Sequence, residues 1–81
     1  MILLRIPSIK SKAGYSSTTS VYNAVRDGLL PRLVKLGERA VGMPDYELDA
    51  VLAARVAGRS DDEIRALVNR LHAKRAELAT V

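Results

Sequence analysis

Glycine and proline divide this chain into short segments, and this division limits the folds that it can adopt. The five glycines and three prolines are spread over most of the chain, at Pro7, Gly14, Gly28, Pro31, Gly37, Gly42, Pro44 and Gly58. Proline suits the first turn of a helix and glycine the residue after its last turn, so their order predicts helix boundaries. The 81 residues can bury one modest core and leave no room for a deep catalytic cavity. We therefore expect one small domain that is not an enzyme.

Three helices are expected before the last glycine. They cover about residues 7–13, 17–27 and 44–57, and each ends one residue before a glycine. Pro44 opens the third, whose early carboxylates and late Arg55 follow the order that the helix dipole favours. The apolar positions expected to face the core of the second and third helices are Val21, Val25, Leu48, Val51, Leu52 and Val56.

A β-hairpin is expected at about 33–43, between the second and third helices. Pro31 ends the helical region, and the two apolar segments that follow flank a loop containing Gly37. Two short helices joined by a tight turn at Gly14–Ser16 are typical of a helix-turn-helix, and the hairpin would be its wing. The expected fold is mainly α with a small β-hairpin, a winged helix-turn-helix with about four helices.

The last segment, residues 60–81, carries the strongest helix pattern. Ser60 and Glu63 stand three apart, as in a capping box that begins a helix. Apolar residues then continue at helical spacing, at Ile64, Leu67, Val68, Leu71 and Leu78.

This helix has two possible uses. We expect residues 1–59 to form the DNA-binding core and residues 60–81 to pack on it or to dimerise. Leu71 and Leu78 could form a dimer or partner seam, or they could pack on the third helix and the wing, because their spacing is only roughly heptad.

The positive charge is concentrated in the first half of the chain. Residues 1–44 hold seven basic and two acidic residues, a balance of +5, whereas residues 45–81 have a balance of −1. A surface that contacts a polyanion is therefore expected in the first half.

The second helix is the candidate reading helix, because its non-core face carries short hydrogen-bonding side chains. Asn23 could pair with an adenine edge and Arg26 with guanine or phosphate. The ring of Tyr22 could complete the core, or its hydroxyl could reach a phosphate, and a role that uses both ends is favoured. Hydroxyls at the helix start could cap the helix or contact DNA, and they belong to Ser17, Thr18 and Thr19.

Four cations outside the second helix are candidate phosphate contacts. Lys10 and Lys12 lie on the first helix, and Lys35 and Arg39 lie on the hairpin. The alternative is that they are ordinary solvated surface charges. His72 is given no chemical role, because no second metal ligand lies near it in the sequence.

Composition excludes several other classes. The chain has no cysteine and one histidine, so a disulfide framework and a Cys/His zinc site are not expected. The apolar start at residues 1–4 is cut short by Arg5, too early for a signal peptide or a membrane span. We expect a cytoplasmic, nucleoid-associated protein with no cofactor, metal or small-molecule substrate.

Several segments of the chain are familiar. They are Leu-Arg-Ile-Pro at 4–7, Tyr-Asn-Ala-Val-Arg-Asp-Gly-Leu-Leu-Pro at 22–31, Val-Lys-Leu-Gly-Glu-Arg-Ala-Val-Gly at 34–42, and Ala-Ala-Arg-Val-Ala-Gly-Arg-Ser-Asp-Asp-Glu-Ile-Arg-Ala-Leu-Val at 53–68. Over nearly its whole length the chain resembles AlpA-type phage regulatory proteins. The resemblance implies a MerR-like winged helix-turn-helix of prophages and other integrated elements, acting as a transcriptional regulator, an excisionase-like recombination directionality factor, or both.

The resemblance also places the family's parts on this chain. Its reading helix falls on residues 17–27 and its wing tip on residues 37–39. This sequence departs from the family in having hydroxyl residues where an early arginine is usual, and one extra residue between Gly14 and Tyr22. Met43 replaces a common tryptophan.

Two hypotheses about function follow. The first is a sequence-specific duplex DNA-binding protein that self-associates on DNA and works with an integrase or RNA polymerase. The second is a protein-interaction adaptor of antitoxin or anti-repressor type that uses the C-terminal helix. Substitutions separate them, since the first is sensitive at Thr18, Asn23, Arg26 and Arg39 and the second at Leu71 and Leu78.

Overall fold

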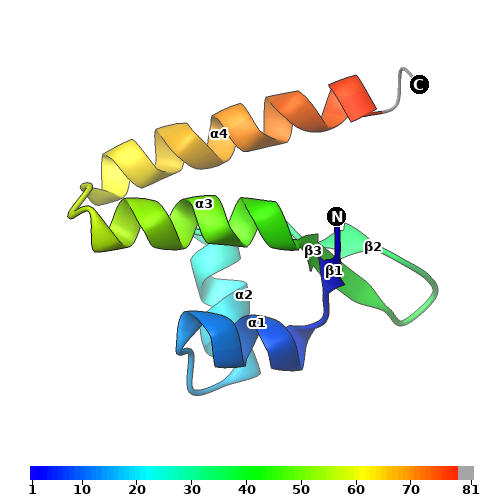
Figure 1. The fold of residues 1–81 in the computed structure, drawn as a ribbon. Helices are drawn as coiled ribbons and strands as arrows, with labels where there is room; N and C mark the ends of the chain where they lie inside the picture. The colour runs from blue at the N-terminus through cyan, green and yellow to red at the C-terminus, as the bar shows by residue number, and fades with distance from the viewer. Residues whose placement is uncertain (79–81) are drawn as a thin grey trace.

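The computed structural model describes residues 1–78, which form four helices and a small antiparallel sheet (Figure 1). In chain order the elements are β1 (Leu3–Leu4), α1 (Ile6–Ala13), α2 (Thr18–Arg26), β2 (Val34–Lys35), β3 (Val41–Pro44), α3 (Asp45–Val56) and α4 (Asp61–Leu78). The expected fold class, a small and mainly helical winged helix-turn-helix, is confirmed. Residues 79–81, which the expected last helix included, lie outside the described residues.

The sheet has one more strand than the hairpin predicted from the sequence. Its order is β1-β3-β2, and both neighbours of β3 run antiparallel to it. Leu4 pairs with Met43 and Val34 with Gly42. A two-residue strand such as β1 has no periodicity that the sequence could reveal, so the apolar start of the chain was not recognised as a strand.

A glycine and a serine fix the turn between α1 and α2. Gly14 has φ of 78°, a left-handed conformation that closes α1 at little steric cost because glycine lacks Cβ. Ser17 is the N-cap of α2, and its Oγ accepts a hydrogen bond from the backbone N–H of Ser20 at 3.1 Å. The prediction that one of the three hydroxyls caps this helix is confirmed.

The two longer helices begin at the residues that the sequence indicates. Pro44 is the N-cap of α3. At α4 the capping box is complete, because Ser60 Oγ accepts from the Glu63 N–H and Glu63 Oε1 accepts from the Ser60 N–H, both at 3.2 Å. None of the helices in residues 1–78 combines the length and apolar character that a membrane span needs.

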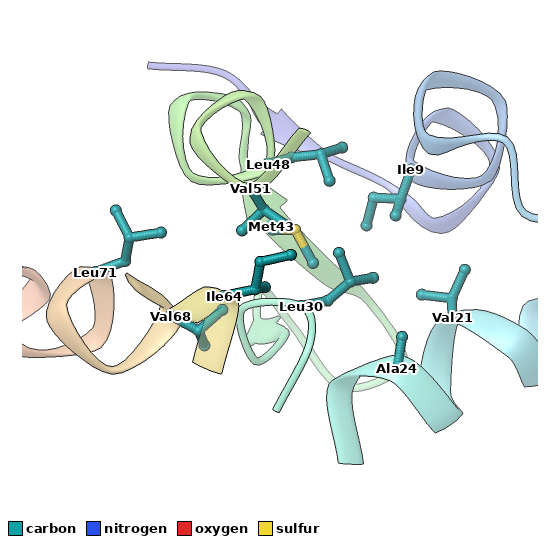
Figure 2. Packing of buried hydrophobic residues seen from close by; sticks show 10 residues of the cluster. All are labelled: Ile9, Val21, Ala24, Leu30, Met43, Leu48, Val51, Ile64, Val68 and Leu71. Carbon is teal, nitrogen blue, oxygen red and sulfur yellow. The ribbon is translucent and has the colours of Figure 1, made fainter. Parts of the chain in front are cut away.

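The core joins every helix to the sheet. Figure 2 shows Met43 of β3 beside Leu30 and Ile64, with Ile9 and Val21 toward the α1–α2 side. The buried apolar residues are Ile9, Val21, Ala24, Leu30, Met43, Leu48, Val51, Ile64, Val68 and Leu71. Burial of an apolar side chain contributes roughly 1.5–3 kcal/mol, so α4, with three members, is an integral part of the core.

One core prediction for α3 is wrong. Val56 was expected in the apolar stripe of α3, but it is 91% exposed. It lies in the last turn of α3, where the chain turns toward α4, and its side chain is directed to solvent. Met43, which replaces the tryptophan expected from the resemblance, is completely buried.

Candidate nucleic-acid interface

The outer face of α2 presents a row of polar side chains. Val21 and Ala24 are buried on the inner face of the helix, and the polar side chains lie on the opposite face. The exposed residues of α2 are Thr18, Thr19, Tyr22, Asn23 and Arg26. All five were predicted site residues, and their spacing of i, i+1, i+4, i+5 and i+8 places them on one face.

Two of the residues predicted at this interface, Ser17 before the row and Tyr22 within it, differ from the others. Ser17 Oγ already accepts the Ser20 N–H and lies 2.9 Å from Ser20 Oγ, so its hydroxyl is engaged within the helix start. Tyr22 is 47% exposed and is not a member of the core cluster. The prediction that the ring of Tyr22 completes the core, alone or together with a contact by its hydroxyl, is therefore wrong.

Arg26 forms a surface ion pair with its neighbour Asp27. Its Nε lies 3.2 Å from Asp27 Oδ1, and the arginine side chain is 71% exposed. Exposed pairs of this kind are worth about 0–1 kcal/mol. A phosphate or a guanine edge could therefore replace Asp27 as the partner of this guanidinium at little energetic cost.

The two lysines of α1 have different environments. Lys10 is half-buried. Lys12 is exposed and its Nζ lies 2.6 Å from Asp49 Oδ1 of α3. An approaching phosphate would compete with Asp49 for Lys12, a pairing that the sequence did not predict.

The wing combines a packed base with an exposed tip. Lys35 and Arg39 are both exposed, and the loop is closed by the Leu36 N–H, which donates to the Ala40 carbonyl at 2.8 Å. At the base, a Cβ on Gly42 would lie 2.8 Å from Leu36 Cδ1 and 3.2 Å from the Leu4 carbonyl oxygen. A larger residue at this point would require Leu36 to move and β1 to shift, so the absence of a side chain lets β3 fit closely between its two neighbours.

Sequence reasoning missed a buried ion pair between α3 and α4. Glu47 is completely buried, and Arg75 is 15% exposed. Arg75 Nε donates to Glu47 Oε2 at 2.9 Å, and Nη2 donates to Glu47 Oε1. The sequence signal that could have revealed the pair is the position of each residue on the buried face of its helix. Glu47 lies one turn before Val51, and Arg75 one turn after Leu71.

His72 is half-buried beside this ion pair. Its Nε2 accepts the backbone N–H of Arg32 at 3.0 Å, which requires that Nε2 carry no proton. Burial of the ring, followed by the positive charges of Arg75 and Arg32, lowers the pKa of His72 below its usual value. The histidine therefore serves as a neutral hydrogen-bond acceptor.

The two leucines considered for a dimer seam have different environments. Leu71 is 8% exposed and belongs to the core, so for this residue the intramolecular alternative holds. Leu78 is 50% exposed. A shallow hollow of about 270 Å³ lies between α3 and α4 and is lined by Ala54, Arg59, Glu63, Ala66, Leu67 and Arg70.

Comparison with known proteins gives the family. The model of the family described as "Prophage CP4-57 regulatory protein (AlpA)" matches residues 2–56. The chain belongs to this family. A protein of Enterobacteria phage P4, named "Uncharacterized protein ORF88", is 38% identical over 56 residues, a match that spans 69% of this chain and 62% of the phage protein. No solved structure matches.

The AlpA match covers the helix-turn-helix, the wing and α3. It ends at residue 56, whereas the resemblance seen in the sequence extended to residue 68. The α4 residues Arg65, His72 and Arg75 therefore lie outside the matched region. The chain is a member of a family of prophage regulatory proteins, and α4 lies outside the part of the chain that the family model matches.

Proposed function

We propose that this AlpA-family protein binds duplex DNA in a sequence-specific manner, with α2 in the major groove and the wing on the neighbouring backbone. The observation that carries the proposal is the row of five exposed hydrogen-bonding side chains on α2, opposite its buried Val21 and Ala24. A short helix supported by α1 fits the docking mode of helix-turn-helix proteins. Membership in a regulatory family supports the same conclusion.

The side chains divide by the part of the duplex that they would contact. Asn23 and Arg26 would read base edges, because amides suit adenine and guanidinium suits guanine. The hydroxyls of Thr18, Thr19 and Tyr22 would bond to phosphates or bases. Contacts to the backbone would fix the position without reading sequence, and the cations proposed for them are Lys10, Lys12, Lys35 and Arg39.

One domain of this size gives limited affinity, so we expect two or more copies on adjacent or repeated sites. Half-sites on one face of the duplex are spaced by about 34 Å, one helical turn. As a transcriptional regulator the protein would act with RNA polymerase, and as a recombination directionality factor it would bend DNA for an integrase. The adaptor alternative loses one of its two contact residues, because Leu71 is part of the core.

Selection of bound duplexes from a random pool tests the proposal. The enriched site is then titrated with salt for the wild type, Asn23→Ala, Arg26→Ala and the control Arg70→Ala. Arg70 is exposed on α4, which lies on the far side of α3 from α1 (Figure 1), and its loss changes the net charge as much as that of Arg26. We expect Arg26→Ala to weaken binding by about 1–3 kcal/mol, and Arg70→Ala to leave it unchanged. Failure to enrich any sequence at low salt would contradict the proposal.

A further inference from the structure

Three side chains of α4 hold the backbone that joins α2 to the wing. Arg65 Nε donates to the carbonyl of Asp27, the C-cap of α2, at 2.9 Å. His72 Nε2 accepts the N–H of Arg32 at 3.0 Å, and Arg75 Nη2 donates to the Arg32 carbonyl at 2.8 Å. The N–H and the C=O of Arg32, two residues before β2, are therefore both bound by α4.

These contacts hold positions 27 and 32 of the connection at residues 27–33. The three α4 residues are spaced i, i+7 and i+10, which places them on one face of the helix. Between the two held points, Leu30 is 2% exposed and Pro31 is buried. At Gly28, with φ of 77°, the position of a Cβ lies 3.4 Å from Arg65 Cγ, so the arginine stem covers the turn that ends α2.

Glu47 fixes the arginine that holds the wing. When Nε and Nη2 of a guanidinium both bind one carboxylate, the orientation of the guanidinium plane is fixed relative to that carboxylate. Nη2 of Arg75 also reaches Arg32, so the Glu47 carboxylate of α3 determines where the carbonyl before β2 lies. The ion pair is shielded from water, because Glu47 is 0% and Arg75 15% exposed, and it is therefore a more rigid support than a surface pair.

We propose that α4 is a brace that sets the position of the wing relative to α2, with Glu47, His72 and Arg75 as positioning residues. The consequence for DNA binding rests on the proposed function. If α4 fixes the wing relative to α2, both elements contact one DNA site together, so that the contacts of the wing depend on those of α2. The part about geometry does not depend on DNA. Because α4 binds backbone atoms of Asp27 and Arg32, these contacts do not depend on the side chains of those two residues.

The distance between α2 and the wing, measured in the protein without DNA, tests whether α4 sets their relative position. The chain has no cysteine, so spin labels at Asn23→Cys on α2 and Glu38→Cys on the wing report one distance distribution. The brace variant is Glu47→Leu with Arg75→Leu, since replacing a buried ion pair by apolar residues is often neutral or stabilising. The matched control, Arg55→Leu with Asp61→Leu, removes another α3–α4 ion pair, of 3.4 Å, at the opposite end of α4 from Arg75. Both changes leave the net charge unchanged.

We expect one narrow distribution in the wild type and the control, and a distribution at least about twice as broad in the brace variant. An unchanged width in a folded brace variant would overturn the proposal. Arg75→Lys is a second test that applies even if the double leucine variant does not fold. It keeps a positive charge opposite Glu47 but lacks the fork that reaches Glu47 and Arg32 together, so it too is expected to broaden the distribution.

Binding to the selected DNA site tests the consequence. When two sites in a protein are independent, a substitution at one changes the affinity by the same factor, within about twofold, whether or not the other is substituted. We expect Arg39→Ala to weaken DNA binding in the wild type. In the brace variant the same substitution is expected to weaken binding by a factor at least about threefold smaller, because the wing is no longer held where Arg39 contacts the DNA backbone. An equal factor in both backgrounds would overturn the coupling. A wild type that selects no DNA would defeat the proposed function, while the spin-label distances would still decide on the brace.

Discussion

The helices α2 and α4 both carry polar side chains along one face, but they direct them to different partners. On α2 the exposed row from Thr18 to Arg26 is directed away from the molecule. On α4, Arg65, His72 and Arg75 bind the backbone of the same chain. The polar groups of α2 remain available to a ligand, whereas those of α4 are part of the structure.

Two arginines show how the environment decides this difference. Arg26 and Arg75 each pair with a carboxylate, yet Arg26 is 71% exposed and Arg75 is 15% exposed. Water screens the first pair, so a new anion can replace its carboxylate, but separating the second would leave a charge in the core.

The largest effect is expected from Arg75→Ala. The substitution leaves Glu47 completely buried without its cation, and breaking such a pair is expected to lower the free energy of unfolding by about 3–5 kcal/mol. Arg26→Ala, the matching change on α2, is expected to lower it by less than about 0.5 kcal/mol. Urea denaturation followed by circular dichroism measures both. Similar losses for the two variants would remove the distinction between the helices.

The next largest effect is expected at the base of the wing, from Gly42→Ala. The new methyl group would lie 2.8 Å from Leu36 Cδ1 and 3.2 Å from the Leu4 carbonyl oxygen. The leucine side chain can move, but the carbonyl belongs to β1, so we expect a loss of about 1–3 kcal/mol in stability. Gly37→Ala at the wing tip is the control, because its nearest neighbour is 4.0 Å away. Equal denaturation midpoints for the two variants would show that the sheet accommodates the methyl group.

Features marked by local sequence were predicted well. Gly14, Gly28 and Gly58 were expected just after helices, and all three have positive φ. The Ser60–Glu63 capping box formed as expected. Each of these signals lies within a few residues, so the conformation that it specifies does not depend on the rest of the fold.

Features that depend on distant parts of the chain could not be predicted. Leu3 pairs with Pro44 across the sheet, and Glu47 pairs with Arg75 across 28 positions. The exposed row of α2 was predicted because its periodicity is local, but the partner of Lys12 was not. A single sequence gives the direction of a side chain on its helix, but not which other helix lies opposite.

The serine caps provide a smaller and more selective comparison. Ser17→Ala and Ser60→Ala each remove a hydroxyl that caps a helix, α2 and α4 respectively, and each is expected to lower stability by about 1 kcal/mol. Their effects on DNA are expected to differ, because fraying of the first turn of α2 moves Thr18 and Thr19, which are part of the proposed interface. Binding is measured at a temperature where both variants are folded. An equal loss of affinity would mean that stability alone explains the effect.

The smallest effect is expected in the pH dependence of stability, through His72. Its pKa is lowered in the folded protein by burial, by Arg75 and by Arg32, with Glu47 as the one opposing charge. The unfolded chain therefore binds a proton first as the pH falls below about 6.5. The stability present above that pH is lost as the pH falls through the lower folded pKa, since protonated His72 can no longer accept the Arg32 N–H.

His72→Gln separates this titration from the loss of the hydrogen bond. Glutamine keeps an acceptor that can receive the Arg32 N–H but has no charge to gain in this pH range. We expect urea midpoints of the wild type to fall between pH 7 and pH 5 by more than those of the variant, on the order of a few tenths of a molar. Identical slopes would mean that His72 titrates alike in the folded and unfolded states. In that case the contact with Arg32 would contribute nothing to holding α4 against the wing, and the brace would rest on Arg65, Arg75 and Glu47.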